Sequence, residues 1–167
     1  KSENGSGGFL YTESSDQTGF GAVILISNTA KTDGGAIAAG RAAKLLFSGT
    51  DSDISYNKAG RNGGAVSLAA GASAAFSGDS FKASGNSAYN GGFLYCDGAR
   101  VRFEKRALFS GNESRDKGGA AYITNNSDVS FTDAVFDGNR SSGLGGAVYA
   151  ESSVVTFKTN ADKKTVF

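Results

Sequence analysis

Short apolar runs alternate with polar positions along this chain, and the same runs return at a nearly fixed interval. A Gly-Gly pair opens each of the six copies: GGFLYT (7–12), GGAIAA (34–39), GGAVSL (63–68), GGFLYC (91–96), GGAAYI (118–123) and GGAVYA (145–150). The first glycines of these pairs are separated by 27, 29, 28, 27 and 27 residues. A period in this range indicates a solenoid built from one structural unit per repeat.

Within each repeat the apolar residues alternate with period two, which predicts strands and not helices. A first strand follows the glycines, and a second follows about ten residues into each repeat, as in Val101-x-Phe103 and Val129-x-Phe131. A third strand ends in FSGN (109–112) or FDGN (136–139). Looser versions are LISN (25–28), ISYN (54–57) and FKASGN (81–86). FKASGN is two residues longer than the other versions.

Three short strands in one repeat leave no room for crossover helices, and identical columns are explained if each repeat is one turn of a coil. We therefore predict an all-β fold, a single-stranded parallel β-helix of about six coils of 27–29 residues with three short strands each. The right hand of the coil is expected from the strand crossover rule. Stacked Phe and β-branched residues are expected to fill the interior of a single domain over residues 1–167.

The Gly-Gly pairs and an asparagine before each of them are interpreted as structural motifs of the repeat. The glycines are expected at sharp corners that need a positive φ. The asparagines are expected to tolerate the left-handed conformation and to hydrogen-bond to one another along the stack. These residues are Gly34, Gly35, Gly63, Gly64, Gly91, Gly92, Gly118, Gly119, Gly145, Gly146, Asn28, Asn57, Asn86, Asn112 and Asn139.

Composition excludes several classes of function. The net charge is +1 without a basic cluster, so no nucleic acid is expected as a partner. One Cys and no His provide neither a disulfide framework nor a zinc site, and we expect no metal or cofactor. That residue, Cys96, is expected to be a buried thiol beside Leu94. The chain starts at Lys1 and has no long apolar run, so we expect a fragment of a longer protein, with membrane attachment only through a segment outside it.

Acidic residues on the outside of the coil are candidates for polysaccharide hydrolysis, which needs two or three carboxylates on one face. The arginines Arg100 and Arg102 flank Val101 on an outward face, with no acidic cluster expected one coil away. Solvated turn charges are the favoured interpretation, and no catalytic residue is assigned. The candidate carboxylates are Asp51, Asp53, Asp128, Asp133 and Asp137.

The tetrapeptides GGAI (34–37), GGAV (63–66 and 145–148), FSGN (109–112) and FDGN (136–139) form a pattern. It resembles the paired GGA[ILV] and FxxN motifs of the chlamydial polymorphic membrane proteins, over about residues 7–160. Leu25 and Ile54 replace Phe, and Phe93 stands where that family prefers Ala. Members of the family look like autotransporters with a signal peptide, a β-helical passenger and a C-terminal outer-membrane barrel. The resemblance implies an extracellular, surface-exposed passenger module that acts as an adhesin.

Three tyrosines, Tyr95, Tyr122 and Tyr149, share one outward register in consecutive repeats and are the candidate binding residues. An exposed strip of tyrosines suits a protein or glycan partner on another cell surface, although it equally suits a ladder that stiffens the sheet. The predicted function is therefore non-catalytic adhesion to a host or neighbouring cell. The alternatives are a structural spacer or filament, whose open ends allow end-to-end self-association, and a polysaccharide-active enzyme.

Overall fold

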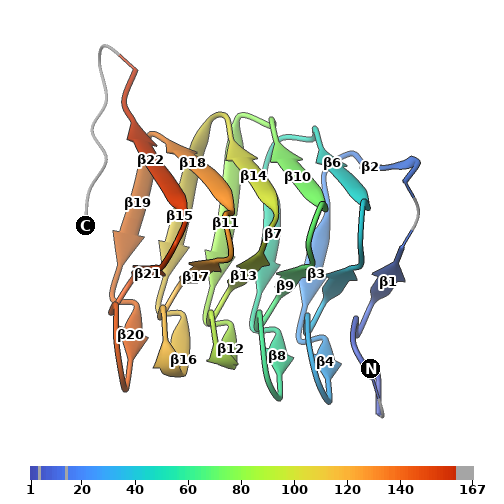
Figure 1. Cartoon of the computed structure of the whole chain (residues 1–167). Helices are drawn as coiled ribbons and strands as arrows, with labels where there is room; N and C mark the ends of the chain where they lie inside the picture. The colour runs from blue at the N-terminus through green and yellow to red at the C-terminus, as the bar shows by residue number, and fades with distance from the viewer. Residues whose placement is uncertain (4, 14, 161–167) are drawn as a thin grey trace.

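The computed structural model describes residues 1–3, 5–13 and 15–160 and is a parallel β-helix (Figure 1). The coils lie side by side along one axis, with the N-terminal coil at the right of Figure 1 and the C-terminal coil at the left. Strands of successive coils pair in parallel, as β9 pairs with both β5 and β13. The described residues contain no helix. The fold predicted from the repeat is confirmed.

The first sheet consists of the strands that follow the Gly-Gly pairs. Their inward residues stack in the predicted column, in which Leu94 pairs with Val66 on one side and with Ala121 on the other. The strands, in spatial order, are β1 (Leu10–Thr12), β5 (Ile37–Ala39), β9 (Val66–Leu68), β13 (Leu94–Asp97), β17 (Ala121–Thr124) and β21 (Val148–Ala150).

The second sheet carries a continuous stack of phenylalanine rings that faces the interior. Adjacent rings lie 4.5 Å apart between Phe47 and Phe76 and again between Phe76 and Phe103, nearly parallel in both cases. Offset stacking of this kind adds to the free energy gained by burying the rings. The strands are β2 (Gln17–Phe20), β6 (Lys44–Phe47), β10 (Ser73–Phe76), β14 (Arg100–Phe103), β18 (Asp128–Thr132) and β22 (Val154–Lys158).

The third sheet closes the interior. Each of its strands ends two residues before the repeated asparagine. Phe109 and Phe136 stack here at 4.8 Å, and both are buried. Together with the rings of the second sheet they fill the core. The strands are β3 (Ile24–Ile26), β7 (Ser52–Ser55), β11 (Ser80–Ser84), β15 (Arg106–Ser110) and β19 (Ala134–Asp137).

A fourth short strand in each coil was not predicted, so the expectation of three strands per coil is wrong. These strands are mostly polar and give no apolar alternation. They form because a neighbouring coil supplies the backbone partner, as when the Lys58 amide donates to the Asn28 carbonyl at 2.9 Å. They are β4 (Thr29–Ala30), β8 (Lys58–Ala59), β12 (Ser87–Asn90), β16 (Glu113–Lys117) and β20 (Arg140–Ser141).

The number of coils is also slightly smaller than predicted. The first and second sheets have six strands each, whereas the third and fourth have five. Six Gly-Gly corners open six coils, but among the described residues the last coil contributes only β21 and β22. The described chain therefore makes about five turns.

The two glycines of each pair are needed for different reasons. The first adopts the left-handed conformation, as Gly118 does with φ of 65°, which confirms the predicted corner. In the first five pairs the second is needed for close approach between coils: a Cβ on Gly119 would lie 1.9 Å from the carbonyl oxygen of Gly146. In the last pair a Cβ on Gly146 would meet only the Asn139 carbonyl oxygen, at 3.7 Å. The Gly-Gly pair therefore combines a turn with a contact between neighbouring coils that leaves no room for a side chain.

The asparagine stack is present, but its predicted left-handed conformation is wrong. The left-handed residue is the one immediately before each asparagine: Ser27, Tyr56, Gly85, Gly111 and Gly138. The Asn86 side chain donates to Asn112 Oδ1 at 2.9 Å and to the Ile54 carbonyl at 2.9 Å. It also accepts from the Asn57 amide at 2.8 Å. The asparagines recur along the stack because they bridge three coils, and not because of their backbone angles.

The stretch FKASGN is not two residues longer than its counterparts. Asn86 follows Ala83 by the same interval that separates Asn112 from Phe109, and Ala83 pairs with Phe109. Phe81 pairs with Ala107, so the phenylalanine and alanine have exchanged places on the strand. The apparent insertion is therefore a change in which residue fills the core.

Candidate functional site: the tyrosine face of the first sheet

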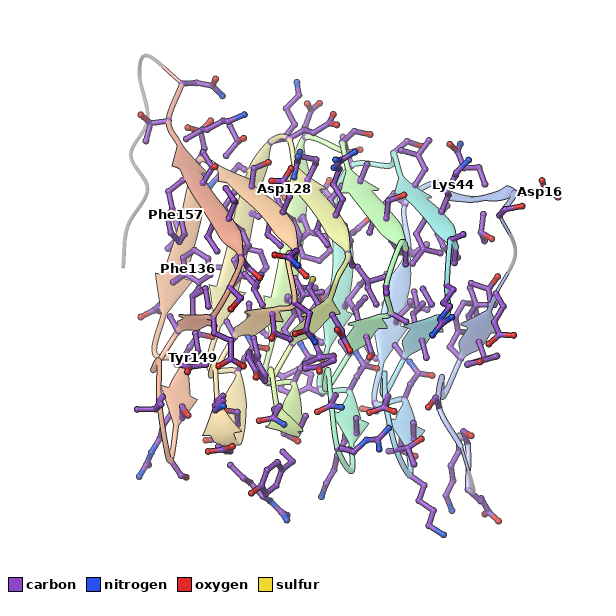
Figure 2. All side chains as sticks on the ribbon, viewed as in Figure 1. Asp16, Lys44, Asp128, Phe136, Tyr149 and Phe157 are labelled. Atoms are coloured by element: carbon purple, nitrogen blue, oxygen red, sulfur yellow. The ribbon has the colours of Figure 1, made fainter. Side chains whose placement is uncertain are left out.

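The candidate binding tyrosines lie in one register on the outside of the first sheet. Tyr95 pairs with Tyr122, and Tyr122 pairs with Tyr149. The ring centroids lie 5.3 Å apart in the first pair and 5.4 Å apart in the second. Tyr149 is labelled in Figure 2, next to β21. The predicted outward direction is confirmed, since the neighbouring Leu94 and Cys96 are fully buried.

The strip is continuous but not uniformly exposed, which corrects the prediction of an exposed strip. Tyr122 retains only 8% exposure because a ring covers it on either side, whereas Tyr95 and Tyr149 are half-buried. The accessible part of the strip therefore belongs mainly to Tyr95 and Tyr149, with Tyr122 packed between them.

Two charged residues hold the rings of Tyr122 and Tyr149, and sequence reasoning missed both. The Tyr122 hydroxyl donates to Glu151, and the Tyr149 hydroxyl donates to the same carboxylate at 3.2 Å. The Lys117 ammonium lies 5.3 Å from the Tyr122 centroid and 5.1 Å from that of Tyr149, within the range of a cation–π interaction. Glu151 follows Tyr149 by two residues, so period-two alternation places both side chains on the outer face. That alternation could have predicted the contact between Glu151 and the tyrosines.

The cluster shifts the titration of its members. Burial, followed by the hydrogen bond to Glu151, raises the pKa of Tyr122 to about 12. Burial also raises the pKa of Tyr95 to about 12. The hydrogen bond from Tyr122 lowers the pKa of Glu151. The Tyr122 phenol is therefore a neutral donor and Glu151 is an anion at physiological pH.

The arginines of β14 have one acidic partner in the next coil, Asp128, which is a single carboxylate and not a cluster. Arg100 pairs in register with Asp128 of β18, and Arg102 forms a salt bridge with the same carboxylate. Arg102 Nη1 also donates to the Asp128 carbonyl at 2.7 Å. The hydrogen bond from Arg102 to the carboxylate lowers the pKa of Asp128, which Figure 2 labels on β18. The Asp128 carboxylate is therefore paired with two guanidinium groups, one of which is formally balanced by its charge.

The other candidate carboxylates lie on different strands and turns. Asp53 forms a salt bridge at 3.0 Å with Lys82 of the next coil. Asp133 is buried and accepts from the Asn160 backbone and side chain. Asp51 and Asp137 are exposed, Asp51 in a turn and Asp137 at the end of β19. Within the described part of the chain, no group of three or more His, Cys, Asp or Glu residues could hold a metal ion.

Cys96 lies in the inward column of β13 and is fully buried, as predicted. Burial raises the pKa of its thiol well above the ordinary value, because the thiolate would lose its hydration. A thiol in this state packs as a small apolar side chain and is not a nucleophile.

In the described residues no helix is long and apolar enough to cross a membrane.

Comparison with known families gives one match. Residues 133–151 match the Chlamydia polymorphic membrane protein repeat. This segment holds FDGN, the Gly145–Gly146 corner and Tyr149, so it covers both motifs of one repeat. No curated protein and no solved structure matched the chain. The repeat, recognised from its motifs, is confirmed in this segment.

Proposed function

We propose that this chain is a surface-exposed passenger module of an autotransporter-like protein, and that it binds a protein or glycan on a host or neighbouring cell without catalysis. The match of residues 133–151 to the Chlamydia polymorphic membrane protein repeat carries this proposal. A surface location of the parent chain belongs to the same proposal, and membrane attachment would come from a segment outside these residues.

The tyrosine strip supports a binding role. The rings of Tyr122 and Tyr149 are held by Glu151 and Lys117 before any partner arrives. Side chains that are ordered in advance lose less conformational entropy on binding, so more of the contact energy appears as affinity. Tyrosine also combines an apolar face with a hydroxyl, which is why it is enriched at interfaces.

The scattered carboxylates support a role without catalysis. Asp128 and Asp53 are each engaged by cationic side chains of a neighbouring strand. Glycoside hydrolysis requires two carboxyl groups facing one scissile bond, whereas the five candidate carboxylates lie on different strands and turns.

The experiment is adhesion of mammalian cells to beads that carry residues 1–167. The variant Tyr95→Ser/Tyr149→Ser removes the two accessible rings and leaves Tyr122 in place, and we expect it to lose most of the adhesion. The matched control is Tyr56→Ser/Tyr89→Ser, because these tyrosines are 61% and 48% exposed and lie outside the strip. Equal adhesion of the two variants would contradict the assignment of binding to the strip, and no adhesion by the parent chain would contradict the adhesin function.

A structural spacer or filament is the second candidate. Among the described residues, β1 and β22 each pair on one side only. Phe9, directly before β1, and Val154, the first residue of β22, are more than half exposed. Open strands of this kind can pair with another copy. Light scattering tests this function: growth of long assemblies with concentration favours the filament, whereas a monomer at every concentration contradicts it.

A further inference from the structure

The outward column that contains the tyrosines has a gap two coils long. In register, the column runs Tyr11, Ala38, Ser67, Tyr95, Tyr122 and Tyr149. Ala38 and Ser67 replace a large ring with a methyl and a hydroxymethyl group, so the surface falls away between Tyr11 and Tyr95. A hollow of about 530 Å³ lies over these two small residues, which is a volume typical of small-molecule sites.

The spacing of the coils sets the length of the hollow. Tyr11 and Tyr95 are three strands apart, which corresponds to about 14 Å at the usual strand separation. Of these two tyrosines Tyr11 lines the hollow and Tyr95 does not, so one sugar ring packs on Tyr11 and a linked ring extends over Ala38 and Ser67. Tyr11 is 55% exposed and available for such a contact.

The polar lining contains both donors and acceptors. Glu13 and Asp33 provide carboxylate oxygens, Arg41 provides a guanidinium group, and Ser67 provides a hydroxyl. Arg61 binds Asp33 through two hydrogen bonds, at 3.0 Å and 2.6 Å, and so neutralises it. With Glu13 opposite in sign to Arg41, the charges around the hollow sum to zero.

These properties favour a neutral sugar over other ligands. Sugar hydroxyls both donate and accept hydrogen bonds, so they match a mixed lining, and sugar rings have apolar faces that can pack on tyrosine. An acidic ligand would meet the Glu13 carboxylate. An extended peptide could not add as a strand, because β5 and β9 under the hollow are already paired on both sides.

We propose that the hollow over Ala38 and Ser67 binds a neutral oligosaccharide, with one ring packed against Tyr11 and hydroxyls bound by Glu13 and Arg41. The inference rests on the proposed function in one respect, since it selects a glycan from the two partner classes named there. It also places the sugar beside the tyrosine strip of the last three coils and not on it.

The experiment fills the hollow. Ser67→Tyr completes the tyrosine column next to Tyr95, and aromatic pairing across strands should keep the variant folded. Ala75→Tyr is the control, because Ala75 is a half-buried outward residue of β10 in the second sheet. Purified parent and variants are titrated by calorimetry with cellobiose, maltose, lactose, chitobiose and sialyllactose, after a circular dichroism spectrum confirms strand content.

We expect the parent to bind at least one of the four neutral disaccharides, Ser67→Tyr to raise its Kd about tenfold or more, and Ala75→Tyr to leave it nearly unchanged. A parent that binds none of them, or binds only the anionic sialyllactose, overturns the proposal. So does binding that survives in a folded Ser67→Tyr variant.

The bead assay separates this proposal from the adhesin function. Cells that adhere equally well to Ser67→Tyr and to the parent, while the Tyr95→Ser/Tyr149→Ser variant fails, would overturn the hollow and leave adhesion in place. Disaccharide binding without any cell adhesion would support the hollow and contradict the adhesin.

Discussion

The ring centroids of Phe81 and Phe93 lie 5.7 Å apart in the core, where Phe93 occupies a position that is alanine in most other repeats. Ala83 stands in the register of Phe109 and is too small to fill that place. Phe93 is fully buried and also contacts the ring of Phe109 at 5.6 Å. The two departures from the repeat pattern, at Ala83 and at Phe93, therefore compensate each other.

We expect Phe93→Ala to lower the free energy of unfolding by about 3–5 kcal/mol, because it opens a cavity that Ala83 cannot fill. The matched control is Phe9→Ala, since Phe9 has the same place in the first GGFL motif but is 56% exposed. Its effect should stay within about 0.5 kcal/mol. Urea unfolding followed by circular dichroism measures both. Adding Ala83→Phe to Phe93→Ala should recover part of the loss, and no recovery would contradict the compensation.

The asparagine stack predicts a large effect for one polar substitution. Asn86→Ala should lower the free energy of unfolding by about 3 kcal/mol, because the buried Ile54 carbonyl and Asn57 amide each lose a partner. Asn86→Asp keeps the shape but removes the donors, and should also destabilise. Asn28→Ala, at the less buried end of the stack, is the control and should cost about 1 kcal/mol. Thermal unfolding in which the three variants match the parent would show that the stack adds nothing to stability.

The two roles of glycine predict a ranking of three alanine substitutions. Gly119→Ala should cost about 3 kcal/mol or more, because the new Cβ collides with backbone of the next coil. Gly111→Ala, with φ of 58° and open space around it, should cost only the left-handed strain of about 1–2 kcal/mol. Gly19→Ala has neither constraint and should change stability by less than about 0.5 kcal/mol. Chemical denaturation gives the ranking, and a Gly111→Ala effect as large as that of Gly119→Ala would contradict the close approach.

The tyrosine strip predicts a loss of stability at high pH. The pKa values of Tyr95 and Tyr122 are raised to about 12 in the folded chain, from the ordinary value of 10.0. A raised pKa gives stability that is complete below the unfolded value and is lost as pH rises towards the folded one. Stability should therefore fall between about pH 10 and pH 12. The variant Tyr95→Phe/Tyr122→Phe should show a smaller fall over the same window, measured by urea unfolding at each pH, and an identical fall would contradict the shifts.

The sequence alone determined the coil, because a repeat that stacks on itself places like residues on like. Period-two alternation placed Leu94 and Cys96 inward and Tyr95 outward, and the spacing of Gly-Gly placed the corners. The asparagine stack followed from the same register. Whether a side chain points inward or outward, and where the chain turns, depend on the local sequence, so both can be predicted from the sequence alone.

Tertiary structure decided what depends on neighbouring coils. The fourth strand has no apolar pattern and exists because another coil supplies its hydrogen-bond partners, as Asn28 does for Lys58. The burial of Tyr122 depends on the rings above and below it, and the pairing of Arg102 with Asp128 depends on contacts between coils. The hollow over Ala38 and Ser67 exists because the stacking of coils places these small residues next to Tyr11, Glu13 and Arg41. Residues 26 to 29 apart in the chain are in contact in this fold. Their side chains therefore determine how exposed each neighbour is, which charge it faces and how much space surrounds it.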